Sequence, residues 1–253
     1  MMKLSSKELK RRAREILTGR YGLPMMAFVL MELLVLLLNA PFQPSLQQPL
    51  NGFQIAVFFI ATLFISLLAI VLHSGILYIH LQLSRNKEAQ VKDVFRYFNR
   101  RPDRFLLSGL LLVCIIAVPA LPAAAVTILL ITTGADTLFC LILAAAVWIP
   151  TLTFLCILAF SYDPLFFLLI EYPDEKILHL FKQSRRLMRG NKARKFYIAC
   201  SFLGLSLLSG LSFGIGLLWV SPYINQVNAE FYRDITGETA QEIEQENAPE
   251  YNI

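Results

Sequence analysis

Long apolar stretches alternate with short polar segments along the chain, and this alternation predicts its architecture. Several stretches approach the length of about 20 predominantly apolar residues that a helix needs to cross a bilayer. We therefore expect an all-α fold, a polytopic membrane helix bundle with six transmembrane helices, five being the alternative. The predicted spans cover about residues 21–39, 55–77, 105–131, 138–160, 196–212 and 216–232.

The last apolar region, residues 196–232, leaves the number of spans open. It is too long for one span, and it contains the glycine-rich stretch 210–216, which is typical of a tight reversal. Two spans are therefore the favoured interpretation. The second of them is poor in apolar residues toward its end, where the polar residues are Asn225, Gln226, Asn228 and Glu230.

The polar segments ahead of the spans carry apolar residues at helical spacing. In the first segment, Leu9, Ala13 and Leu17 recur every fourth residue, as on one face of a helix, and most residues between them are charged. Such stripes predict three amphipathic helices, over about residues 5–18, 91–99 and 174–189. A basic face opposite an apolar stripe is typical of a helix that lies in the membrane interface, and we expect that placement here.

Basic residues are concentrated in these same polar segments. Of the 23 Lys and Arg residues, all but one lie within residues 3–20, 85–104 and 176–195. The loops at the other ends of the spans, about 39–54 and 132–137, contain no Lys or Arg. Because basic loops stay on the cytoplasmic side, we expect a multi-pass protein of the cell membrane with a cytoplasmic N-terminus.

Composition supports a membrane protein and narrows its partners. Hydrophobic residues make up 56% of the chain and charged residues 16%, and the mean hydropathy is +0.58, far from the values of a soluble domain. The net charge of +5 does not indicate a nucleic-acid partner, because each basic segment adjoins an apolar span. Membrane lipids, above all anionic ones, are the expected partners. We expect one transmembrane domain over residues 1–235 and a disordered acidic tail over 236–253.

Glu32 is the first candidate for a functional residue. It lies near the middle of the first predicted span, where a charged side chain costs on the order of 2.5–3.5 kcal/mol to insert. We expect it to face the interior of the bundle, where it handles a proton or cation or bonds to a neighbouring helix. Direct contact with His73 is not expected, since at 1.5 Å per residue the two differ in depth by roughly 12 Å.

The other polar residues of the spans are predicted to lie in the cytoplasmic half of the bundle. They suggest a polar cavity that faces the cytoplasm, is ringed by arginines and holds a lipid headgroup or an anionic solute. The alternative is that these side chains meet water at the span ends. The candidate intramembrane polar site comprises Glu32, His73, Asp163, Asn225, Gln226 and Asn228, with His80 and Glu230 nearby, and the candidate headgroup contacts are Arg11, Arg14, Arg96, Arg185, Arg186 and Arg189.

Three stretches of the chain resemble one family of membrane proteins. They are Glu8-Leu9-Lys10 with Ala13-Arg14, Leu17 and Gly19; Ser184-Arg185 with Leu187-Met188 and Gly190-Asn191-Lys192; and Gly214-Ile215-Gly216-Leu217-Leu218-Trp219 with Pro222-Tyr223 and Phe231-Tyr232-Arg233-Asp234. On these residues the chain is similar to the domain-of-unknown-function 975 family of bacterial integral membrane proteins. The resemblance extends to about residue 235, and it implies a multi-span protein whose activity is not established.

The sequence offers little support for catalysis. It contains no H-E-x-x-H motif and no P-loop, and its four cysteines stand singly in apolar stretches, so we expect neither an enzyme nor a cofactor or metal. The expected function is the binding of lipid or protein partners at the cytoplasmic membrane face, and a homo-oligomer is one form that such a partner takes. The alternative is a component of a small-solute or lipid transporter or exporter.

Overall fold

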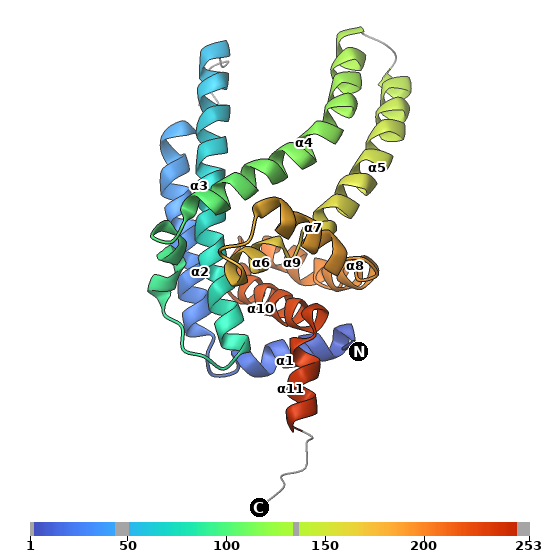
Figure 1. The fold of residues 1–253 in the computed structure, drawn as a ribbon. Coiled ribbons are helices and arrows are strands. Elements are labelled where there is room, and N and C mark those ends of the chain that lie inside the picture. The colour runs from blue at the N-terminus through green and yellow to red at the C-terminus, as the bar shows by residue number, and fades with distance from the viewer. Residues whose placement is uncertain (1–2, 44–50, 134–136, 247–253) are drawn as a thin grey trace, which may run out of the picture.

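The computed structural model describes residues 3–43, 51–133 and 137–246, and all regular elements in this part of the chain are helices (Figure 1). The all-α class is therefore confirmed for these residues. In chain order the elements are α1 (Ser6–Leu17), α2 (Gly22–Asn39), the 3₁₀ helix η1 (Ala40–Phe42), α3 (Gly52–Ser84), the 3₁₀ helix η2 (Val91–Phe98), α4 (Pro102–Thr133), α5 (Thr137–Ser161), α6 (Leu165–Glu171), α7 (Ile177–Leu187), α8 (Lys192–Cys200), α9 (Leu203–Leu211), α10 (Leu217–Thr236) and α11 (Glu238–Glu246).

Four helical segments are long and apolar enough to cross a membrane. They are Gly22–Phe42, Gly52–Ser84, Pro102–Thr133 and Thr137–Glu171, with mean hydropathies of 2.1, 3.0, 2.5 and 2.4. At most 17% of the residues in their most apolar windows are buried, so most of their apolar side chains face outward. Apolar surface on this scale is typical of contact with lipid. The four segments coincide with the first four predicted spans and indicate a membrane protein.

These helices form two hairpins that diverge toward one end of the molecule. α2 lies beside α3 and α4 beside α5, and both hairpins extend toward the top of Figure 1. α1 and the helices α6 to α11 gather at the opposite end, together with both termini. The three basic segments thus lie toward the same end, as the positive-inside rule requires of loops on one side of a membrane.

The predicted fifth and sixth spans are not among the four apolar segments. Residues 196–212 fall in α8 and α9, which have nine residues each and are interrupted at Ser201 and Phe202. Nine helical residues extend only about 14 Å, roughly half of the hydrocarbon core. α10 has 20 residues, but the polar residues in its second half lower its hydropathy. The predicted count of six spans is therefore not confirmed in the part of the chain that the structure describes.

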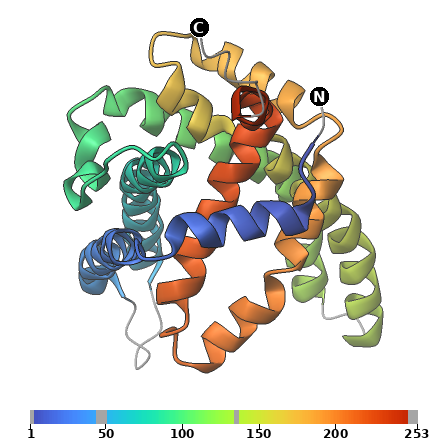
Figure 2. The same cartoon turned by 90° about the horizontal axis from the view of Figure 1, so that it is seen from below.

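Helices form in all three basic segments, as α1, η2 and α7, but the apolar stripe of α1 does not face lipid. Leu9, Ala13 and Leu17 are fully buried, and the first two share a cluster with Phe231 of α10. Figure 2 shows α1 crossing α10 at the basic end of the molecule. The stripe that predicted an interfacial helix instead packs α1 against the protein, which corrects the placement expected for this segment.

The buried core also lies at the basic end, between α3, α6, α7 and α10. Leu168 of α6 and Leu180 of α7 are fully buried there, and the ring of Phe167 stacks on that of Tyr232 with centroids 4.8 Å apart. η2 packs closely on α3 at Gly75. A Cβ on this glycine would lie only 2.2 Å from a backbone oxygen of η2, so the contact requires a residue without a side chain.

The acidic tail begins with a helix rather than disorder. α11 follows Gly237, whose φ of +88° ends α10 in the left-handed conformation that glycine accepts readily. Glu238 and Glu242 of α11 both pair with Arg233 of α10. These pairs compensate two of the acidic residues of the tail, and residues 238–246 form a helix where disorder was expected. Residues 247–253 lie outside the described part of the chain.

Candidate functional site

A cavity of about 520 Å³, which we call the basic cavity, lies on the outer face of α7. The inner face of this helix carries Leu180, Phe181 and Ser184, which are buried in the protein. Since residues three and four apart share a helix face, this packing turns a row of cations toward solvent. The cavity is lined by the cations Lys182, Arg185, Arg186 and Arg189 and by the apolar side chains of Tyr162, Leu178 and Phe181.

The cations of the basic cavity have no acidic partner among the described residues. No carboxylate lines the cavity, and within the part of the chain that the structure describes no hydrogen bond or ion pair engages these four side chains. Leu178 beside them is 73% exposed. The cavity therefore joins unpaired guanidinium groups to exposed apolar surface, a combination that suits an anionic group on an apolar body.

The other candidate arginines have different surroundings. Arg11 pairs with Glu8 and with Glu15, the latter at 3.2 Å, so its charge is already balanced. Arg96 pairs with Asp93 at 3.3 Å. Arg14 is exposed, and its side chain makes no hydrogen bond or ion pair in the described part of the chain. Of the six predicted headgroup contacts, the structure therefore brings together only Arg185 and Arg186 of α7 and Arg189, which follows the end of that helix.

A second cavity lined by arginines, of about 430 Å³, lies between η2, α4 and the loop after α6. Arg101 pairs there with Asp174 at 2.9 Å, and Arg104 donates to backbone carbonyls of the same loop. Arg96, which also lines this cavity, lies over the ring of Tyr78 in a cation–π contact. These arginines fix the loop and η2 in place, which leaves less positive charge for a ligand than in the basic cavity.

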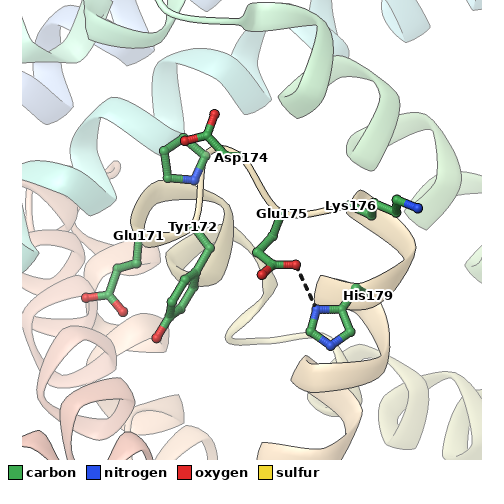
Figure 3. A pocket seen from close by; sticks show the side chains of 7 residues that line it. Glu171, Tyr172, Asp174, Glu175, Lys176 and His179 are labelled. Atoms are coloured by element: carbon green, nitrogen blue, oxygen red, sulfur yellow. Dashed lines mark ion pairs between the residues drawn. The ribbon is translucent and has the colours of Figure 1, made fainter.

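A third cavity, of about 620 Å³, is formed by the loop between α6 and α7 (Figure 3). It contains three carboxylates, and that of Glu175 lies 3.2 Å from His179. In Figure 3 the carboxylates of Glu171 and Asp174 point away from each other. Over the described residues, no group of three His, Cys, Asp or Glu side chains is arranged to hold a metal ion.

Part of the predicted polar site does assemble, between α3 and α10. The Oε1 atom of Gln226 lies 2.8 Å from Nδ1 of His80, and its amide nitrogen donates to the hydroxyl of Ser84 at 2.7 Å. Both His80 and Gln226 are fully buried. These side chains hydrogen-bond to one another across a helix contact, while Nε2 of His80 is buried with no hydrogen-bond partner among the described residues. The cavity expected at these two residues is therefore a packed hydrogen-bonded contact.

Asp163 and Asn228 meet at a lysine that sequence reasoning did not single out. The Nζ atom of Lys195 lies 2.8 Å from Oδ2 of Asp163 and 2.8 Å from Oδ1 of Asn228. This contact links α8, α10 and the turn before α6. Asn225 and His73 are half-buried, and within the described residues neither side chain makes a hydrogen bond or an ion pair.

Glu32 lies apart from these groups and is exposed rather than turned into the bundle. It lines a cavity of about 560 Å³, which we call the Glu32 cavity, between α2 and the turn that joins α9 to α10. It has no hydrogen-bond or ion-pair partner among the described residues, and His73 does not line the cavity. The other lining residues are Phe28, Val29, Leu33, Leu36, Phe213, Gly214, Leu217, Leu218 and Ser221.

The turn beside the Glu32 cavity contains the stretch Gly210-Leu211-Ser212-Phe213-Gly214, which has the G-x-S-x-G spacing of a nucleophilic serine. That motif acts from a sharp turn between a strand and a helix, with its hydroxyl exposed. Here the stretch ends helix α9, and the Ser212 hydroxyl donates to the carbonyl of Ser209 at 2.8 Å and accepts from the amide of Gly216 at 2.9 Å. The hydroxyl of Ser212 therefore stabilises the C-terminal end of α9 through these two hydrogen bonds.

A charged cluster that was not predicted joins the ends of α3, α6, α10 and α11. It contains Arg85, Glu171, Glu230, Arg233, Glu238 and Glu242. Burial alone would raise the pKa of Glu238, but Arg85 and Arg233 hold that pKa below its ordinary value. Two sequence signals pointed to the cluster: Arg233 is the only Lys or Arg outside the three basic segments, and Glu238 and Glu242 are one helical turn apart.

Comparison with known families decides the classification of the chain. The model of a family described as "Protein of unknown function (DUF975)" matches residues 1–239. The chain belongs to this family. The assignment suggested by the three motif stretches is confirmed, while no curated protein and no solved structure matches the chain.

In this DUF975 protein the three stretches that carry the resemblance lie together. Leu9 and Ala13 of the first stretch, Met188 of the second and Phe231 of the third belong to one buried cluster at the basic end. The second stretch also supplies Arg185 to the basic cavity. The residues on which the family resemblance rests therefore build the packed base that presents this cavity.

Proposed function

We propose that this protein binds anionic lipid headgroups at the cytoplasmic face of the cell membrane, and that its role is binding rather than catalysis. The observation that carries the proposal is the basic cavity, where the cations of α7 have no carboxylate partner among the described residues. The cavity also joins these cations to exposed apolar surface at Leu178. A phospholipid presents the complementary pair of a phosphate and an acyl chain.

The strength expected of such a site follows from its charge. Guanidinium groups bind phosphate through paired, charge-assisted hydrogen bonds. Each basic side chain near an anionic membrane surface contributes about 1 kcal/mol. Arg185, Arg186 and Arg189 together therefore supply about 3 kcal/mol, which corresponds to roughly 100-fold in affinity.

Native mass spectrometry in mild detergent tests the proposal, with phosphatidylglycerol and phosphatidylcholine offered in equal amounts. Wild-type protein is expected to retain phosphatidylglycerol selectively. The variant R185Q/R186Q/R189Q should lose between 10-fold and 100-fold of that affinity, within the roughly 100-fold bound set by the charge estimate. The matched control, K7Q/R11Q/K87Q, removes the same charge from exposed residues that line none of the four cavities, and it should retain the selectivity.

The same spectra contain the results that would overturn the proposal. Unchanged phosphatidylglycerol binding by the α7 variant would rule out the basic cavity as the site. Equal losses in the α7 variant and the control would show diffuse surface attraction, with no site on α7. A second subunit bound in place of lipid would favour a protein partner at this face.

A carrier for a small solute or lipid is the second proposed function. It is supported by the Glu32 cavity, because this carboxylate lies in the middle of an apolar helix and opens onto a cavity instead of packing against a neighbour. The buried contact between His80 and Gln226 does not support a carrier, since it encloses no space for a solute.

A further inference from the structure

The Glu32 cavity places one carboxylate in otherwise apolar surroundings. α2 extends from Gly22 to Asn39, so Glu32 lies in the middle of this apolar helix. Apart from the hydroxyl of Ser221, the remaining lining side chains are apolar, and Gly214 contributes only backbone. The volume of about 560 Å³ is in the range of sites that enclose small organic molecules.

The described chain provides no positive charge for this carboxylate. Glu32 has no ion pair, and no Lys, Arg or His lines its cavity. An ionised group in the apolar layer of a membrane is costly unless it is paired. α2 and α3, which stand side by side, contain no Lys or Arg along their whole length. A cation that pairs with Glu32 must therefore come from another molecule.

A second copy of this chain does not offer such a cation. Among the four apolar segments, Arg104 is the only Lys or Arg. Arg104 is buried near the start of α4, and its guanidinium donates to carbonyls of the loop after α6. An anionic lipid would bring the wrong sign of charge. The partner that fits is a separate molecule with its own positive charge and an apolar body.

We propose that the Glu32 cavity binds a monovalent lipophilic cation, such as a hydrophobic amine or a quaternary ammonium or phosphonium ion. The charge of the ligand lies against Glu32, and its apolar body lies against Leu36 of α2 and Leu217 of α10. Charge complementarity selects the sign of the ligand, and the apolar lining selects its hydrophobic character. This site is separate from the basic cavity and does not depend on lipid binding there.

Binding of tetraphenylphosphonium to the full-length protein in lipid nanodiscs tests the proposal. Isothermal titration calorimetry should show saturable binding of one ion per protein. Glu32→Gln keeps the size of the side chain and removes its charge, and affinity should fall at least 10-fold. Glu15→Gln makes the same change at an exposed residue of α1 and should leave affinity unchanged. Tetraphenylborate, a similar ion of opposite charge, should not bind saturably.

The design separates loss of the site from loss of the fold. Removing an ionised group from an apolar helix makes insertion easier, so Glu32→Gln is expected to fold. Glu32→Asp keeps the charge and should retain saturable binding. The proposal fails if wild-type protein shows no saturable binding, if Glu32→Gln binds tetraphenylphosphonium as the wild type does, or if tetraphenylborate binds equally well.

Discussion

Arg233 keeps its charge in the interior of the protein because acidic partners surround it. Its side chain is 2% exposed, and it pairs with Glu230, Glu238 and Glu242 while donating to the backbone carbonyl of Ser84. Desolvation makes such a cluster a modest source of net stability. Removing one member of the cluster costs much more stability, because the buried charges that remain lose the opposite charge that compensated them.

Substituting Arg233 tests whether loss of one charge destabilises the cluster. Arg233→Met should lower the free energy of unfolding by about 3–5 kcal/mol, because Glu230 stays buried without its cation. Thermal unfolding in detergent measures the loss, and Arg11→Met, on an exposed ion pair, should cost less than about 1 kcal/mol. Adding Glu230→Gln to Arg233→Met should recover part of the stability. Similar melting curves for the two single variants would show that the cluster is not stabilising.

Single residues also mark the limit of what the sequence predicts. Hydropathy and helix rise placed Glu32 in the middle of the first apolar helix, where the structure has it. The direction of its side chain depends on the neighbouring helices, and in the structure Glu32 lines a cavity beside the turn that follows the short α9. Arg233 was passed over because its acidic partners follow in a tail whose composition indicated disorder.

Among the elements, α11 shows how charge pairing orders a segment. Glu238 connects α11 both to Arg233 of α10 and to Arg85 at the end of α3. Its pKa in the folded protein is below the ordinary value of 4.5. A depressed carboxylate pKa stabilises the fold above the ordinary pKa, and this contribution is lost as pH falls through the lowered value.

For α11 we predict a pH-dependent difference in melting temperature between the wild type and Glu238→Gln. At neutral pH, Glu238→Gln should melt at a lower temperature than the wild type. The gap should stay constant down to about pH 5 and then shrink as Glu238 becomes protonated in the wild type. Melting curves between pH 3 and pH 7 measure the gap, and Glu15→Gln serves as the control for an exposed pair. A gap that grows toward acid would contradict the assigned direction of the pKa.

The helices of the basic segments could be predicted from the sequence, but the elements that pack against them could not. Helical spacing located α1 correctly, and Ser5 accepts the amide of Glu8 at 3.2 Å, as its cap position indicates. Periodicity shows that a helix has an apolar face without showing whether lipid or protein covers it. The apolar face of α1 is covered by α10, because Leu9 and Ala13 pack in one cluster with Phe231.

For the whole molecule, the distribution of charge carried most of the correct information. The basic segments and the uncharged loops alternate along the chain, and the structure places the basic segments toward one end of the two hairpins (Figure 1). The last apolar region was harder, because total apolar length does not reveal interruptions. α8 and α9 are separate short helices, and the turn after α9 lies beside the middle of α2, where both line the Glu32 cavity.

The depth of that turn yields a topological prediction. A sixth span would require the turn to reach the outer surface with the hairpin ends. In the structure the turn lines the Glu32 cavity beside the middle of α2, and we therefore predict that α8 to α10 enter the membrane only part of the way. In a variant with Cys114, Cys140, Cys156 and Cys200 replaced by serine, Gln43→Cys should react with a membrane-impermeant maleimide on intact cells. Lys176→Cys, in the third basic segment, should react only after permeabilisation. Phe213 is 99% exposed in the structure, yet Phe213→Cys should resist the reagent on intact cells, because we expect lipid to surround this position. Labelling of Phe213→Cys as fast as that of Gln43→Cys would establish two complete additional spans and contradict the partial entry of α8 to α10.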